Sequence, residues 1–283
     1  AIILLINRRI RALSDQLMRV YSSGLRTDIR DNEEGVMSIL QNDIYKIIRT
    51  FHEQKKQSEK DRTFLADTIS DISHQLRTPL TSMQMMNELL QQDLPPAQRQ
   101  TFSQCMSQQL ERLEWLVSSL LKLARMDACA ITFHPSQITL QQLVLTALEP
   151  LTSMIQEKQI KIDMDKASIS VSTDPEWSAE AILNILKNAA EHTPQGGTIT
   201  ITARQTPIHT ALQINDSGPG MTHEELAHVF ERFYRGKHAK DNSVGIGMAM
   251  AQAIMRAQGG DISAANEPGA GASFTVLFQA SAS

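Results

Sequence analysis

Apolar residues recur at helical spacing through the second quarter of the chain. Between residues 63 and 92 they follow one another at intervals of three, four and seven: Leu65, Ile69, Ile72, Leu76, Met83, Met86 and Leu90. The pattern returns further on at Leu110, Leu113, Val117, Leu120 and Ala124. Such spacing predicts two amphipathic helices with a heptad seam. The segment Asp93–Pro96, which holds two prolines, predicts the turn between them.

Two short amphipathic helices joined by a turn have too little surface to bury a core of their own. A dimeric four-helix bundle solves this problem, because the seams of two copies pack together. The alternative is a monomeric helical hairpin that packs on the rest of the chain. The pattern favours the dimeric bundle.

The pattern changes after residue 129, where short β-type runs alternate with helical segments. The predicted strands are Ile160–Met164, Ile169–Thr173, Thr198–Arg204, Ala211–Asp216 and Ser273–Phe278. The predicted helices are Leu140–Gln156, Glu176–Glu191 and Gly247–Gln258. This order predicts an α+β two-layer sandwich, with helices on one face of a mixed sheet.

The first residues are apolar and are followed at once by arginines. Residues 1–6 are wholly apolar, and Arg8, Arg9 and Arg11 come next. Arginines after an apolar run are typical of the cytoplasmic end of a membrane helix, so residues 1–7 are interpreted as the end of a truncated transmembrane segment. The start of an amphipathic helix is the alternative. Residues 8–62 are predicted to be a polar signalling helix, with a break in Ser22–Gly35.

Composition excludes some functions. The chain has 283 residues, with 27 Lys and Arg against 31 Asp and Glu, which gives a net charge of −4. A general nucleic-acid binder needs a basic face, so we expect no nucleic-acid partner. The two cysteines, Cys105 and Cys129, form neither a disulfide framework nor a metal-binding spacing.

His74 falls on the face of the first predicted helix that lies opposite the seam. Thr78 lies one turn later on the same face, Gln75 flanks it, and Pro79 interrupts the helical pattern. A proline inside a helix removes a hydrogen bond and predicts a kink. A lone histidine is usually an ordinary surface residue, but this setting favours a functional site.

Three further segments combine polar residues and glycines. Glu180, Asn184, Asn188 and Glu191 share one face of a predicted helix, where amide oxygens can bind Mg²⁺ or phosphate-bound water; a solvated polar face is the alternative. Asp216–Gly220 ends a predicted strand, either as an ordinary turn or as a place where backbone and carboxylate meet a base. Gly245 and Gly247 precede a predicted helix, whose N-terminus favours phosphate.

The segment Ser73–Leu80 resembles the phosphoacceptor motif of bacterial sensor histidine kinases. The resemblance implies that His74 accepts the γ-phosphoryl group of ATP and passes it to an aspartate of a response regulator. It also implies that Thr78 positions the water that dephosphorylates the regulator. Most family members carry Glu or Asp after the histidine. Gln75 can orient the ring but cannot accept a proton, so we expect it to hold the tautomer of His74.

The second half of the chain resembles the Bergerat-type ATP-binding fold, which histidine kinases share with type II topoisomerases, Hsp90 and mismatch-repair ATPases. The resemblance is carried by Asn184 and Asn188, by Asp216–Gly220, by Phe230–Arg235, and by Gly245 and Gly247. Gly269–Gly271 is similar to the family's last glycine motif.

This resemblance assigns roles to the matching residues. It implies that Asn188 binds Mg²⁺, Asn184 lines the phosphates and Asp216 recognises adenine. Gly218 and Gly220 would shape the base pocket, and residues 219–247 would form a lid. The other residues expected to bind the nucleotide are Phe230, Arg232, Phe233, Gly245 and Gly247.

The chain departs from the family at two places in these motifs. Ala249 replaces a frequent third glycine, and Glu191–His192 replaces the common Lys–Tyr or Lys–Phe. The basic phosphate contact is therefore missing at position 191. The sequence offers four substitutes and does not choose among them: His192, Arg232, Arg235 and Lys237.

Three functions fit these motifs: a sensor histidine kinase, an ATPase of the same fold, and a nucleotide-binding scaffold. A water-activating ATPase of the same fold carries a glutamate where this chain has Asn184, so phosphoryl transfer to His74 is favoured over hydrolysis. A nucleotide-binding scaffold without chemistry is favoured only by Gln75 and Glu191. A related serine kinase normally lacks the histidine bundle.

The sequence therefore predicts a histidine kinase that uses ATP and Mg²⁺ and forms a homodimer through the bundle. It would sit in a bacterial cell membrane through an upstream segment, with this region on the cytoplasmic side. The predicted parts are 1–7, the end of the membrane helix; 8–62, the signalling helix; 63–128, the dimerisation and phosphotransfer domain; and 129–283, the catalytic domain.

Overall fold

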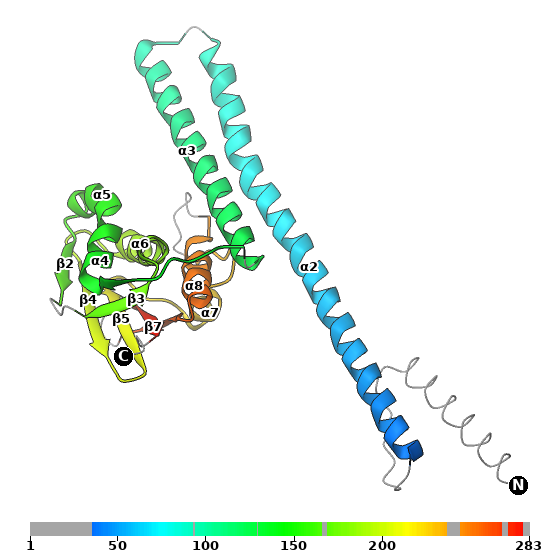
Figure 1. The fold of residues 1–283 in the computed structure, drawn as a ribbon. Helices are drawn as coiled ribbons and strands as arrows, with labels where there is room; N and C mark the ends of the chain where they lie inside the picture. The colour runs from blue at the N-terminus through cyan, green and yellow to red at the C-terminus, as the bar shows by residue number, and fades with distance from the viewer. Residues whose placement is uncertain are drawn as a thin grey trace, which may run out of the picture. The chain divides into compact units, whose positions relative to one another are not determined.

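A computed structural model gives the fold (Figure 1) and describes residues 36–92, 94–128, 130–165, 169–236, 244–267 and 271–279. The chain divides into two compact units, residues 1–73 and 74–283, and each is described by itself. Residues 1–7, the predicted break at Ser22–Gly35, Lys237 and the pair Gly269–Ala270 lie outside the described residues.

The first described element is the long helix α2, Val36–Leu90. It is continuous across residues 62 and 63, where the sequence suggests a change from linker to bundle, and it includes Pro79. Apolar side chains such as Ile47 and Phe51 are exposed on its N-terminal part. In the described part of the chain no helix has an apolar stretch that could cross a bilayer.

Helix α3, Pro96–Asp127, follows the predicted turn and begins with a proline, which fits the first helical position. Its C-terminal half buries Leu116, Ser119, Leu123 and Met126. The three apolar members of this set belong to the same core cluster as the sandwich. Of the predicted seam, Leu120 also packs against this cluster, whereas Leu110 and Val117 are 55% and 46% exposed. Helix α3 therefore has two apolar faces, one covered by its own chain and one open.

Residues 136–279 form the predicted sandwich. A five-stranded sheet has the order β2-β4-β5-β7-β6, in which only β2 and β4 are parallel, and β1 pairs with β3 in a separate antiparallel ribbon. The strands are β1 (Ser136–Thr139), β2 (Lys161–Met164), β3 (Ser170–Thr173), β4 (Thr198–Gln205), β5 (His209–Asp216), β6 (Asp261–Asn266) and β7 (Ala272–Gln279).

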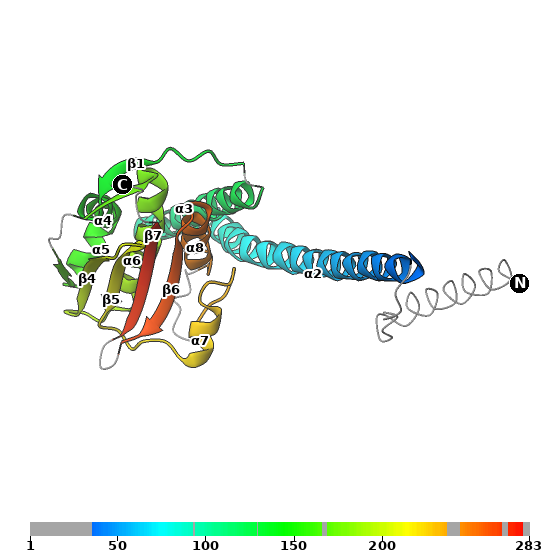
Figure 2. The same ribbon diagram turned by 60° about the horizontal axis from the view of Figure 1, so that its bottom comes forward.

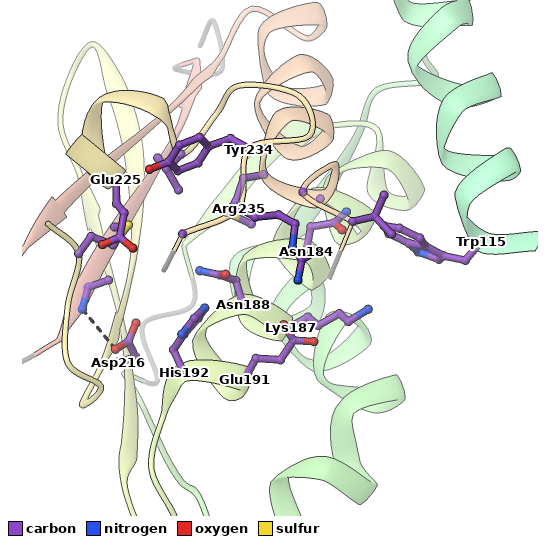
Figure 3. A pocket seen from close by; sticks show the side chains of 18 of the residues that line it. Trp115, Asn184, Lys187, Asn188, Glu191, His192, Asp216, Glu225, Tyr234 and Arg235 are labelled. Carbon is purple, nitrogen blue, oxygen red and sulfur yellow. Dashed lines mark hydrogen bonds between the residues drawn. The ribbon is translucent and has the colours of Figure 1, made fainter. Parts of the chain in front are cut away.

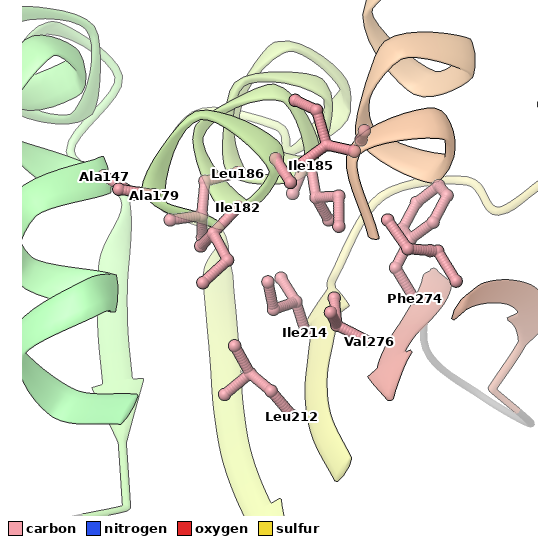
Figure 4. Close-up of a cluster of buried hydrophobic side chains, with 14 of the residues drawn as sticks. Ala147, Ala179, Ile182, Ile185, Leu186, Leu212, Ile214, Phe274 and Val276 are labelled. Atoms are coloured by element: carbon pink, nitrogen blue, oxygen red, sulfur yellow. The ribbon is translucent and has the colours of Figure 1, made fainter. Parts of the chain in front are cut away.

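Three helices cover one face of this sheet (Figure 2). They are α4 (Leu140–Leu148), α6 (Pro175–His192) and α8 (Gly247–Ala257). Three shorter helices complete this part of the chain: η1 (Glu149–Leu151) and α5 (Thr152–Glu157) follow α4, and α7 (His223–His228) follows β5. In the core (Figure 4), Ile182 and Ile185 of α6 are fully buried, as are Ile214 and Val276 of the sheet. Residues of β5 alternate between buried and half-buried, so the strand presents one face to the helices.

The predicted fold class is confirmed, and all five predicted strands are present. The sequence missed β1, β6 and α7, each of which is short. The predicted helix Leu140–Gln156 is divided into α4, η1 and α5. Pro150 explains this division, because a proline cannot donate the backbone hydrogen bond of a continuing helix.

Helix α6 is capped at both ends by side chains. Asp174 accepts hydrogen bonds from the backbone N–H groups of Glu176 and Trp177 at the N-terminus. At the C-terminus the Nζ of Lys158 donates to the carbonyl oxygens of Ala190, Glu191 and Thr193, at 2.7, 2.9 and 2.7 Å. A cation at this end also interacts favourably with the helix dipole.

We predict that Lys158→Met lowers the free energy of unfolding by about 2 kcal/mol, because three carbonyl groups lose a charged donor. Chemical denaturation followed by circular dichroism measures this change. Lys161→Met, at an exposed position three residues later, is the matched control and should change stability by less than about 0.5 kcal/mol. Equal effects of the two substitutions would contradict the capping role.

Candidate functional site

A cavity of about 480 Å³ opens beside α6. Its walls come from α6, the segments after β5 and before α8, and one side of α3. In Figure 3 Asp216 lies at one end of the cavity and Trp115 at the other, with Asn184 and Asn188 between them. The cavity therefore has two chemically different ends, an acidic buried one and an aromatic one.

The acidic end is formed by Asp216, the last residue of β5. The residue is 3% exposed, and its Oδ1 accepts hydrogen bonds from the backbone N–H of Gly218 at 2.8 Å and of Ala272 at 3.2 Å. In the described part of the chain Oδ2 accepts no hydrogen bond. Burial raises the pKa of this carboxyl above its ordinary value, and the two hydrogen bonds and nearby His192 lower it in part. Oδ2 is thus an acceptor that a ligand can use.

Two glycines permit the close approach of backbone to this carboxylate. A Cβ on Gly218 would lie 2.7 Å from Asp216 Oδ1 and 2.8 Å from the carbonyl oxygen of His192. A Cβ on Gly271 would overlap the same carboxylate oxygen. Only glycine fits at either position without a shift of the backbone. Gly220, Gly245 and Gly247 line the cavity itself.

The floor of the cavity is the polar face of α6. It is made by Asn184, Lys187, Asn188, Glu191 and His192. The Nδ2 of Asn184 donates to the carbonyl oxygen of Glu180 at 2.9 Å. The opposite face of the helix is held in the core, so the sheet fixes where these five side chains lie.

Glu180 does not line the cavity, although it shares the face with the asparagines. Its carboxylate forms an ion pair with Lys122 of α3 at 2.8 Å. Of the four residues predicted to share a polar face, Glu180 therefore contacts α3, and the other three line the cavity.

The structure does not bring Phe230, Arg232 and Phe233 into the cavity lining. The Phe230 ring packs edge-on against Phe274, with 6.5 Å between centroids. Arg232 forms two hydrogen bonds with the carboxylate of Asp127 at the end of α3, at 2.9 and 2.8 Å. The backbone N–H of Phe233 donates to the carbonyl oxygen of Gly245 at 2.8 Å. These contacts hold residues 230–233 against β7, the end of α3 and the residues before α8.

His74, Gln75 and Thr78 lie on α2, outside the cavity lining. His74 is exposed, as its position opposite the seam predicts, and Gln75 is half-buried. The hydroxyl of Thr78 donates to the carbonyl oxygen of His74 at 3.3 Å.

Several cavity residues escaped the sequence analysis. Trp115 and Lys187 form a cation–π contact, with Nζ 5.2 Å from the ring centroid. Glu225 and Tyr234 line the opposite side. Lys187 stands directly before Asn188 in the chain, and that proximity is the signal that could have identified it.

The cavity suits a divalent cation only if a bound ligand supplies part of the coordination shell of the metal. The described residues contain no group of three or more His, Cys, Asp or Glu side chains placed to hold a metal. Mg²⁺ is usually bound by one or two protein oxygens, with substrate phosphates and water completing the octahedron. The amide oxygen of Asn188 can supply such a ligand, so the site suits a cation that arrives with phosphates.

Two known protein families match different segments of the chain. The family described as "His Kinase A (phospho-acceptor) domain" matches residues 64–129, and "Histidine kinase-, DNA gyrase B-, and HSP90-like ATPase" matches residues 173–282. Together the two matches span well over half of the chain.

Two curated proteins are similar in sequence to most of this chain. The heme sensor protein HssS of Staphylococcus saprophyticus is 30% identical over 211 residues, which is 75% of this chain and 46% of the relative. The signal transduction histidine-protein kinase/phosphatase MprB of Mycobacterium ulcerans is 31% identical over 229 residues, 78% of this chain and 44% of the relative. The chain thus spans less than half the length of these relatives.

Solved structures share the fold. The Acinetobacter baumannii histidine kinase AdeS has a TM-score of 0.63 and 22% identity, covering 73% of this chain and 97% of that one. Histidine kinase ThkA, in a complex with the response regulator protein TrrA, has a TM-score of 0.65 and 18% identity, covering 81% and 66%. From the two family matches and the curated relatives, the chain belongs to the bacterial two-component sensor histidine kinases.

Proposed function

We propose that this chain binds Mg-ATP in the cavity beside α6 and transfers the γ-phosphoryl group to His74. From His74 the group would pass to an aspartate of a response regulator. The nucleotide site is inferred mainly from Asp216. This buried carboxylate has one oxygen held by backbone N–H groups and the other open to the cavity.

Asp216 would recognise adenine. Its Oδ2 can accept a hydrogen bond from the exocyclic amino group of the base. The same carboxylate would repel the carbonyl oxygen that guanine presents at this position. Gly218 would let the backbone turn close to the base, and Gly220 lines the cavity nearby.

The phosphates would lie along α6 toward the N-terminus of α8. Asn188 would ligate Mg²⁺, and Asn184 would line the phosphates. Helix α8 begins at Gly247 and has no side-chain cap, so its first N–H groups can bind an anion. Gly245 and Gly247 would keep this approach open. The cation held by Asn188 would supply charge neutralisation for the phosphates during transfer.

In the transfer step an imidazole nitrogen of His74 would attack the γ-phosphorus in line with the leaving oxygen. A nitrogen–phosphorus bond forms, the bond to the bridging oxygen breaks, and ADP leaves with the electron pair. Gln75 would orient the ring through a hydrogen bond. The hydroxyl of Thr78 would turn from the His74 carbonyl to position the water that dephosphorylates the regulator. The name of MprB, a kinase/phosphatase, supports this second activity.

Transfer would require movement, because His74 does not line the cavity. The ion pairs Arg232–Asp127 and Lys122–Glu180 hold α3 against the ATP-binding part of the chain. They would have to open for the nucleotide to reach a histidine. Phe230, Arg232 and Phe233 would then serve as anchors of the lid over the phosphates.

The chain would act as a homodimer at a membrane. Leu110, Val117 and Leu121 of α3 are exposed in the single chain, and burial against a second copy would complete a four-helix bundle. The structure of ThkA in complex with TrrA supports a response regulator as the second partner. An upstream transmembrane segment would place this region on the cytoplasmic side of a bacterial membrane.

We predict that His74→Gln abolishes labelling of the chain by γ-labelled Mg-ATP, because glutamine has no nucleophilic nitrogen. The label on the parent chain should be acid-labile and stable to alkali. His52→Gln, on α2 outside the motif, is the control and should retain full labelling. Persistent label on the His74 variant would refute His74 as the acceptor.

Asp216→Asn should weaken ATP binding roughly 10- to 100-fold, because a charged acceptor is replaced by an amide. The preference for ATP over GTP should shrink with it. Calorimetric titration with both nucleotides measures the two affinities. Asp163→Asn, at an exposed position on β2, is the matched control, and an unchanged ATP affinity in the Asp216 variant would exclude the adenine assignment.

A further inference from the structure

The phosphate end of the cavity lacks the basic residue that related chains have three positions after Asn188. This chain has Glu191 there, and the structure narrows the choice of a substitute. Arg232 is held by Asp127 through two hydrogen bonds. His192 lies near Asp216, at the end proposed for the base. Lys237 lies outside the described residues. Arg235 lines the cavity, and so does Lys187, a cation that the sequence did not single out.

The geometry of α6 indicates which one. Residues of an α-helix follow one another at about 100° around the axis. Relative to Asn184, Asn188 lies about 40° and His192 about 80° to one side, toward Asp216. Lys187 lies about 60° to the other side, away from the base end. The order His192, Asn188, Asn184, Glu191, Lys187 thus runs across the helix from the Asp216 end of the cavity to the Trp115 end.

Lys187 is currently held by an aromatic ring of α3. Its Nζ lies 5.2 Å from the centroid of Trp115, and both side chains line the cavity, as Figure 3 shows. A cation–π contact of this kind is weaker than a charge-assisted hydrogen bond to phosphate. The lysine can therefore leave the ring when a stronger anionic partner enters the cavity.

We propose that Lys187 is the residue of this chain that contacts the terminal phosphate of ATP, and that Trp115 holds it while that phosphate is absent. The proposal rests on the proposed function, since it requires ATP in the cavity with its base at Asp216. It gives the chain a cation in place of the one lost at position 191. It also links the presence of the γ-phosphate to a contact between α3 and α6.

The first test compares ATP with ADP on the whole 283-residue chain, by calorimetric titration in the presence of Mg²⁺. Lys187→Gln should weaken ATP binding about tenfold and ADP binding much less, because the terminal phosphate loses a charged partner. Lys187→Arg should restore most of the preference for ATP. Lys161→Gln, an exposed lysine outside the cavity, is the control for loss of charge alone.

The second test is a double-mutant cycle with Trp115. Trp115→Leu should strengthen ATP binding about threefold, because Lys187 no longer has to leave the ring. In the Lys187→Gln background the same Trp115 substitution should have no such effect. A fluorescence titration in a Trp177→Phe background, where Trp115 is the remaining tryptophan, should show a change with ATP that ADP does not reproduce.

The outcomes separate this proposal from the proposed function. If the parent chain binds ATP with an affinity that depends on Asp216, but Lys187→Gln keeps the full preference for ATP over ADP, the role of Lys187 is wrong and the nucleotide site stands. Loss of that preference in Arg235→Gln alone would assign the contact to Arg235, another cation of the cavity lining. If the parent chain does not bind ATP, both proposals fail.

Discussion

The buried carboxylate of Asp216 is the constraint on which the candidate site depends. One oxygen binds two backbone N–H groups from different segments, the turn after β5 and the start of β7. The Asp216 carbonyl oxygen accepts a further hydrogen bond from Gly271 at 2.8 Å. A carboxylate buried in this way is costly unless it is well paired, so the surrounding backbone must stay in place. The close contacts at Gly218 and Gly271 follow from this requirement.

Helix α6 connects this constraint with the rest of the molecule. Its apolar face is part of the core, and its polar face is the floor of the cavity. Asp174 and Lys158 fix its two ends. The same helix contacts α3 through Glu180 and Lys187, so one rigid element joins the cavity with the helical hairpin. Residues of α3 and α6 therefore line the same cavity and contact each other beside it.

Local patterns predicted much of this structure. The alternation in β5 and the helical spacing in α6 each reflect a single buried face, and both elements were found with nearly their observed bounds. The segments β1, β6 and α7 were missed because each holds a single large apolar residue, which defines no period. The covered face of α3 was also missed, because Leu116 and Leu123 pack against residues distant in sequence.

The sequence indicates those cavity residues whose type is unusual for their position, and it does not indicate those whose type is common. Asn184, Asn188 and Asp216 stand out because asparagine is a poor helix former and the aspartate precedes glycines. Lys187 and Trp115 are ordinary residues for helices, and only the fold brings them together. Sequence motifs predicted Arg232 as a cofactor contact, but its pairing with Asp127 depends on tertiary structure.

In the proposed complex one cavity orients ATP along α6, with its base at Asp216 and its terminal phosphate toward α3. A crystal structure of this chain with Mg²⁺ and a non-hydrolysable ATP analogue would show the orientation of the nucleotide. We expect the adenine amino group within hydrogen-bonding distance of Asp216 Oδ2, and the terminal phosphate beside Asn184 and Lys187. A nucleotide bound in the reverse direction, or outside this cavity, would contradict this proposal.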